Sequence, residues 1–145
     1  MNNASTFLLL HQMGAYLFLF VFVAAVGCGI WGLIRKQPQA LRWGAWGFVA
    51  AFFVLCIPYG SGFLLKSNLW HGADETFRQL MQKHHDLSKF VLTGSILMFA
   101  ACAAMLKKYK PNEAFPHWLW PNLLFLSWMV VTFIVRSFLH GYRIP

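Results

Sequence analysis

The sequence predicts an all-α membrane protein in which one domain, residues 1–145, is a bundle of four transmembrane helices. Hydrophobic residues make up 59% of the chain and charged residues only 11%, whereas a soluble domain carries about 25% charged residues. Four separate apolar stretches are each close to or above the roughly 20 residues that cross the hydrocarbon core of a bilayer. Trp and Tyr, which favour the membrane–water interface, mark several of their ends.

These four stretches are expected to be helices because backbone N–H and C=O groups in lipid have no water partner and must be paired within the segment. The stretches are also too uniformly apolar for barrel strands, which alternate. The expected helices cover residues 7–34, 43–65, 87–106 and 119–139.

Two interruptions are expected within this pattern. Pro58 lies inside the second helix, and because proline removes a helical hydrogen bond, we expect a kink or an unwound turn there. The polar segment 66–86 is the longest connection, and we expect a short helix around 74–83. Asp74 and Glu75 suit its first turn, and Lys83 suits its last.

The positions of Lys and Arg predict the orientation of the bundle. The two links at 35–42 and 107–118 are short and densely basic, with one acid, Glu113. The other side of the bundle carries as many basic residues as these two links, but they are spread over longer segments that contain more acids. We therefore expect a multi-pass protein of the bacterial inner membrane with both termini on the outer, periplasmic side.

The first residues of the chain and its charge argue against a cleavable signal peptide and against nucleic-acid binding. The first residues carry no basic side chain and the following apolar run exceeds a signal h-region, so we expect no cleavable signal peptide. The formal charge of +8 comes from residues between apolar runs that form no stripe, so the expected partner is the lipid bilayer and not nucleic acid.

Histidines are the most informative polar residues of the chain. In this topology five of the six fall on the outer side: His11, His71, His84, His85 and His140. At 1.5 Å per residue, three of them (His11, His85 and His140) each lie roughly 32–35 Å from the inner end of their helix. Three helices therefore present an imidazole at one level near the outer boundary.

Imidazoles on facing helices are typical of a haem site, where one histidine binds the iron from each side of the ring. His11 with His85, or with His84, meets this requirement and predicts a haem b near the periplasmic face, with His11 and His85 as metal ligands. Gly14, one turn below His11, would leave room for the macrocycle. Arg136, one turn below His140, could pair with a propionate.

Each of these residues also has a structural interpretation. Gly14 could be a helix-packing residue, Arg136 could extend to the headgroups, and the His84-His85 pair could be helix-start residues. Copper would remain an option if Met13 or Met81 lay near the histidines. The apolar segments hold no nucleophile–base–acid set, so whether the chain is an enzyme stays open, and an electron-transfer or accessory subunit is favoured.

Three short motifs resemble a family of small four-helix bacterial membrane proteins of unknown function, the DUF2231 type. They are Leu10-His11-Gln12-Met13, His84-His85-Asp86-Leu87 and Leu139-His140-Gly141-Tyr142-Arg143. The order of segments is also similar to that of small b-type cytochrome membrane subunits, which carry histidine pairs on two helices. The resemblance implies haem binding and no particular reaction.

The combined prediction is a membrane-embedded b-type haem subunit for electron transfer. Its expected partners are other membrane or periplasmic redox subunits, or a quinone. One alternative is a non-catalytic structural subunit of a larger membrane complex. Another is a small metal-handling or transport protein, because transporters use broken helices like the one expected at Pro58.

Overall fold

The computed structural model describes residues 3–111 and 113–141, except for the side chains of residues 3, 4, 138, 140 and 141. This part of the chain is all-helical. Its long helices are α1 (Asn3–Arg35), α2 (Pro38–Leu69), α3 (Glu75–Lys108) and α4 (Trp120–Gly141), with short 3₁₀ helices η1 (Trp70–Gly72) and η2 (His117–Leu119) between them.

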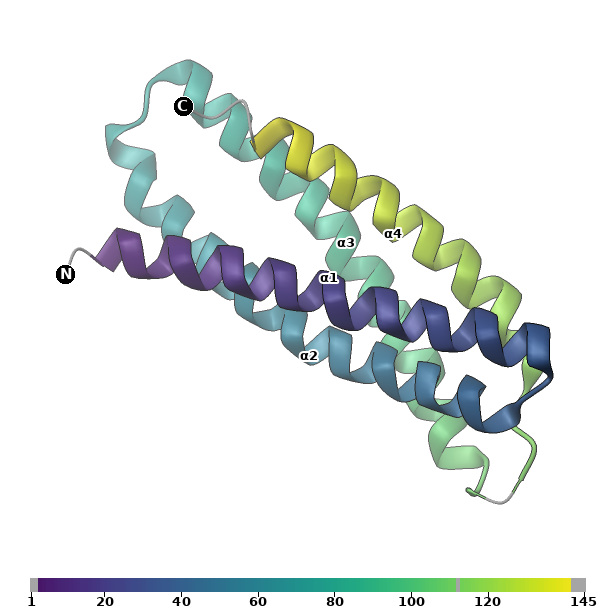
Figure 1. Cartoon of the computed structure of the whole chain (residues 1–145). Helices are drawn as coiled ribbons and strands as arrows, with labels where there is room; N and C mark the ends of the chain where they lie inside the picture. The colour runs from purple at the N-terminus through teal and green to yellow at the C-terminus, as the bar shows by residue number, and fades with distance from the viewer. Residues whose placement is uncertain (1–2, 112, 142–145) are drawn as a thin grey trace.

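Among the described residues, four helices are long and apolar enough to cross a membrane, which confirms the predicted number of spans. Successive helices run in opposite directions, so the start of α1, the end of α4 and the α2–α3 connection lie at one end (Figure 1). We call this the terminal end, and the opposite end, which carries the α1–α2 turn and the α3–α4 loop, the loop end. Large apolar side chains cover the outside, as suits contact with lipid.

The α1–α2 turn is much shorter than the expected link at 35–42. Lys36 adopts a left-handed conformation with φ of 51°, and the Gln37 N–H donates to the Gly32 carbonyl over 2.9 Å. This pattern ends a helix, and Pro38 then begins α2 at a position where its missing N–H costs nothing. Pro38 indicates a helix start before residue 43, because proline is favoured at the first position of a helix.

Helix α3 begins far earlier than the apolar pattern predicts. Asp74 is its N-cap and accepts a hydrogen bond from the Phe77 N–H over 2.7 Å. From Glu75 the helix continues unbroken to Lys108, so the expected short helix and the third span are one element. The reason is that no proline or glycine interrupts residues 75–93.

Helix α1 packs most extensively on α2, whereas α3 packs on both α2 and α4, and α1 and α4 contact each other only sparsely. Small residues allow the close α1–α2 approach. A Cβ on Gly44 would lie 2.9 Å from the Ala25 carbonyl oxygen, and one on Gly47 would lie 2.7 Å from the Ala25 Cβ. Such small-residue seams are typical of helix pairs in membranes.

Trp120, the first residue of α4, packs against α1 and α2 at the loop end. Its side chain is fully buried and its ring centroid lies 5.9 Å from that of Phe48. A Cβ on Gly29 would lie 1.9 Å from the Trp120 ring, and one on Gly44 would lie 2.5 Å from it. The two glycines therefore make the space that this indole fills.

Arg42 is buried and does not face water, although its position in a basic link suggested a surface charge. Its guanidinium donates to the carbonyls of Tyr109 (2.9 Å), Lys110 and Glu113 (3.3 Å). The Phe115 ring lies 5.4 Å from its Cζ. Arg42 thus attaches the α3–α4 loop to the start of α2.

Candidate functional site

His11 lies half-buried on α1 against α2. Its Nδ1 is 2.7 Å from the Pro58 carbonyl oxygen. Because a carbonyl oxygen only accepts, Nδ1 carries the proton and donates it. In the neutral imidazole the lone pair then belongs to Nε2, which is the arrangement that prepares a histidine to bind a metal ion.

Two glycines bring His11 and Pro58 together. A Cβ on Gly62 would lie 2.8 Å from the His11 Nδ1, and a Cβ on Gly14 would lie 2.8 Å from the Pro58 Cδ. Helix α2 runs through Pro58 as one continuous helix, without the unwound turn that the sequence suggested. The proline ring fills the space beside Gly14, which favours the packing interpretation of Gly14 over room for a macrocycle.

His84 on α3 lies directly across from His11. The two ring centroids are 5.9 Å apart and the ring planes make an angle of 67°. The His84 Nδ1 is 2.8 Å from the Ser137 hydroxyl oxygen and 3.4 Å from the Ser137 carbonyl oxygen, both on α4. Ser137 is itself buried. A residue from each of the four helices, His11, Pro58, His84 and Ser137, therefore meets at the terminal end.

His85 points in a different direction from its neighbour His84, since consecutive helical residues do not share a face. Its ring stacks against Tyr59 with centroids 6.2 Å apart, and the Phe63 centroid is 6.5 Å away. Both aromatic residues belong to α2. The structure therefore brings His84, and not His85, against His11.

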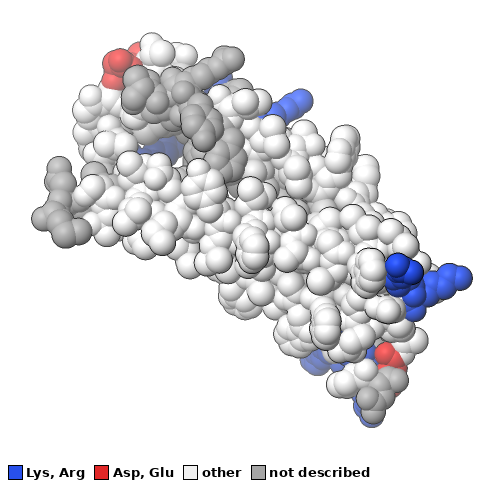
Figure 2. Space-filling model, in the orientation of Figure 1, with Lys and Arg blue, Asp and Glu red and all other residues white. Residues whose placement is uncertain are grey.

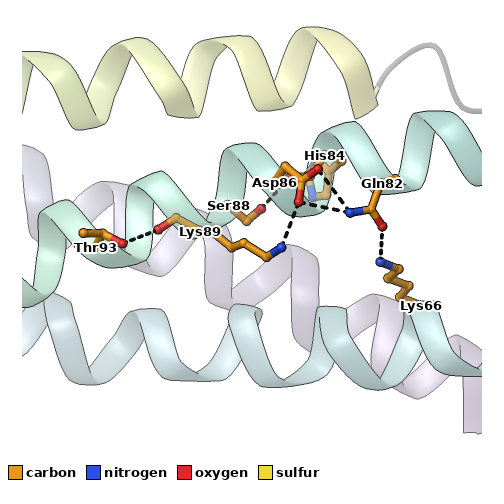
Figure 3. Close-up of polar contacts among 7 residues, drawn as sticks. All are labelled: Lys66, Gln82, His84, Asp86, Ser88, Lys89 and Thr93. Carbon is orange, nitrogen blue, oxygen red and sulfur yellow. Dashed lines mark hydrogen bonds and ion pairs between the residues drawn. The ribbon is translucent and has the colours of Figure 1, made fainter.

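A polar network runs along the α2–α3 side of the site (Figure 3). The Lys66 ammonium on α2 donates to the Gln82 side-chain oxygen over 2.7 Å, and the Gln82 amide donates to the Asp86 carboxylate. Asp86 also forms an ion pair of 2.9 Å with Lys89. The Lys66–Gln82 bond therefore joins α2 to α3, whereas the contacts of Asp86 lie within α3.

Arg136 and two further histidines have exposed side chains. Arg136 is exposed on α4, directly before Ser137, and His71 and His117 are exposed. The side chain of His140 lies outside the described part of the chain. Within that part, no group of three or more His, Cys, Asp or Glu side chains is arranged to hold a metal ion.

Three residues of the site were not predicted in their observed roles. Pro58 drew attention only as a feature that interrupts a helix, whereas its carbonyl is the acceptor for His11, and Gly62 leaves the space that the His11 ring occupies. Ser137 lies 53 residues from His84 in the chain, and no sequence spacing relates residues so far apart.

Comparisons of this chain with protein families, with curated proteins and with solved structures found no match. The interpretation of the site therefore depends on its own geometry.

Proposed function

We propose that this chain is a membrane-embedded electron-transfer subunit that holds one haem b between His11 and His84. The observation that carries the proposal is the contact between these two imidazoles, from α1 and α3, at one level of the bundle. Polar side chains inside a membrane bundle are costly and usually functional. When bound, the haem would supply a reversible one-electron carrier.

The separation of the two rings supports this ligand pair. Two imidazoles that bind one metal ion from opposite sides, at the roughly 2.0–2.1 Å typical of metal–histidine bonds, have ring centroids roughly 6 Å apart. The centroids of His11 and His84 are 5.9 Å apart. The spacing of the two rings therefore supports this pair, whereas the macrocycle itself would need space beside Gly14 that the Pro58 ring now fills.

The number of candidate ligands also favours haem over a bare metal ion. A structural zinc site takes four protein ligands and a catalytic one takes three, and the described residues offer no group of three. Haem supplies four ring nitrogens itself, so two histidines complete its coordination.

Partners outside the coordination sphere would hold both rings in place. The Pro58 carbonyl fixes the orientation of His11 through Nδ1, and Ser137 fixes that of His84. Such contacts set the tautomer and the ring angle of a histidine ligand. Arg136 directly precedes Ser137 but its side chain is exposed on another face of α4, so it would reach a propionate only at the outer edge of the bundle.

We place the site near the periplasmic face of a bacterial inner membrane, with both termini outside. The support is that the Lys and Arg residues of the loop end lie in or beside two short connections, whereas those of the terminal end are spread over longer segments. The haem would then exchange electrons with a periplasmic or membrane redox subunit, or with quinone. Lys110→Cys is expected to react with an impermeant thiol reagent added from the cytoplasmic side. The same reagent added from the periplasmic side is expected to leave it unmodified.

The visible absorption spectrum of the purified chain, oxidised and reduced, tests the proposed cofactor. A b-type cytochrome gives a Soret band and a sharpened α band on reduction. A preparation that carries no chromophore and takes up none from added haem would instead favour a structural subunit of a larger complex.

Gly62→Ala is expected to weaken haem binding by about tenfold, because outer contacts of metal-binding histidines are worth 10–100-fold in affinity. The added methyl group would lie 2.8 Å from the His11 Nδ1 and turn the ring away from Pro58. Gly60→Ala is the matched control, since a Cβ there meets nothing within 4 Å. Equal affinities in the two variants, measured by haem titration, would remove the His11–Pro58 contact from the account.

A further inference from the structure

The loop end carries a second candidate site, on the opposite end of the bundle from the histidines. A hollow of about 230 Å³ lies between α2 and α3 and is lined by Trp46, Val49, Ala103, Leu106 and Lys107. Four of these five side chains are apolar. Lys107 is the exception and stands in the last turn of α3, where the span meets the headgroup region.

Exposed basic side chains gather at the loop end, where this hollow lies. Figure 2 shows Lys and Arg side chains concentrated at the loop end, and the exposed ones are Arg35, Lys36, Lys107, Lys108 and Lys110. Arg42 is also basic, but its guanidinium binds backbone carbonyls and is therefore not available to an anion.

One carboxylate of the loop end already accepts a hydrogen bond from the backbone. Glu113 is the acid of the α3–α4 loop, and its carboxylate accepts a hydrogen bond of 3.0 Å from the Lys110 backbone N–H. Because five exposed Lys and Arg side chains outnumber this carboxylate, the loop end keeps a net positive charge, which attracts anions at the membrane surface.

We propose that this hollow binds one acyl chain of an anionic phospholipid whose phosphate group lies at Lys107. The apolar walls between α2 and α3 suit a hydrocarbon chain, and the exposed half of Trp46 suits the interface. Charge complementarity selects an anionic headgroup over a zwitterionic one. Basic pockets between transmembrane helices bind acidic lipids in this way. The proposal is independent of the proposed haem.

Native mass spectrometry of the full chain, released from nanodiscs, tests the proposal. The nanodiscs would contain equal amounts of phosphatidylglycerol and phosphatidylcholine with the same acyl chains. Wild-type protein is expected to retain one phosphatidylglycerol in preference to phosphatidylcholine. Lys107→Gln is expected to reduce that preference about fivefold, given the contribution of one basic residue at a membrane surface.

Two further variants separate the phosphate contact from the groove and from general charge. Lys83→Gln removes an exposed lysine from the terminal end of the same helix and is expected to leave the preference unchanged. Ala103→Leu fills the hollow and is expected to reduce retention of both lipids. Equal retention of the two lipids by wild-type protein, or equal loss in Lys107→Gln and Lys83→Gln, would overturn the proposal. A stable dimer that Ala103→Leu dissociates would assign the hollow to a second copy of the chain instead.

Discussion

His11→Ala and His84→Ala are each expected to abolish stable haem binding, with a loss in affinity of more than about 100-fold, because each variant would remove one of the two proposed haem ligands and not an outer contact. His85→Ala is expected to keep haem binding close to that of the unmodified chain, since the His85 ring stacks on Tyr59. Titration of each purified variant with haem, followed at the Soret band, measures the three affinities.

His85→Ala is a matched control because it removes the same side chain from the next position of the same helix. Circular dichroism of all three variants checks that the helices remain formed. Haem binding that survives in His84→Ala and disappears in His85→Ala would transfer the ligand role to His85 and contradict the proposed pair.

Arg42→Ala is expected to destabilise the bundle by about 3 kcal/mol, because it removes a buried guanidinium that donates charged hydrogen bonds to three backbone carbonyls. The carbonyls of Tyr109, Lys110 and Glu113 would lose their shared partner, and the α3–α4 loop would lose its attachment to α2. The midpoint of reversible unfolding in mixed micelles of increasing dodecyl sulfate content measures the change.

Two variants identify the source of this stability. Arg42→Lys keeps the charge but has one nitrogen in place of a planar fork, so it is expected to recover less than half of the loss. Arg35→Ala removes an exposed arginine whose Cζ lies 4.8 Å from the Trp31 ring centroid, and is expected to cost less than about 1 kcal/mol. Equal destabilisation by Arg42→Ala and Arg35→Ala would show that the buried contacts contribute little.

The sequence was sufficient to predict the four spans, because lipid demands long apolar helices and few charges. Helix ends were predicted less well. The apolar pattern ends where the hydrocarbon ends, whereas α3 continues beyond it from Glu75, and capping at Asp74 determines its start. Arg42 illustrates the same difficulty, since its charge suggested a solvated loop and only the folded chain reveals its three carbonyl partners.

The site could be predicted in part. The spacing of His11 and the His84-His85 pair along their helices placed them at one level, and the structure does bring His11 and His84 together. The choice between His84 and His85 depends on the rotation of α3 about its axis, which neighbouring histidines cannot reveal. Ser137 lies in the site because α4 packs on α3, and its sequence position does not reveal this contact.

Stoichiometric titration of the purified chain with haem tests the central claim most directly. We expect a single saturable site with an end point of one haem per chain and a six-coordinate, low-spin spectrum that reflects two imidazole ligands. Uptake that never saturates, or a bound haem that remains five-coordinate in the intact protein, would contradict it.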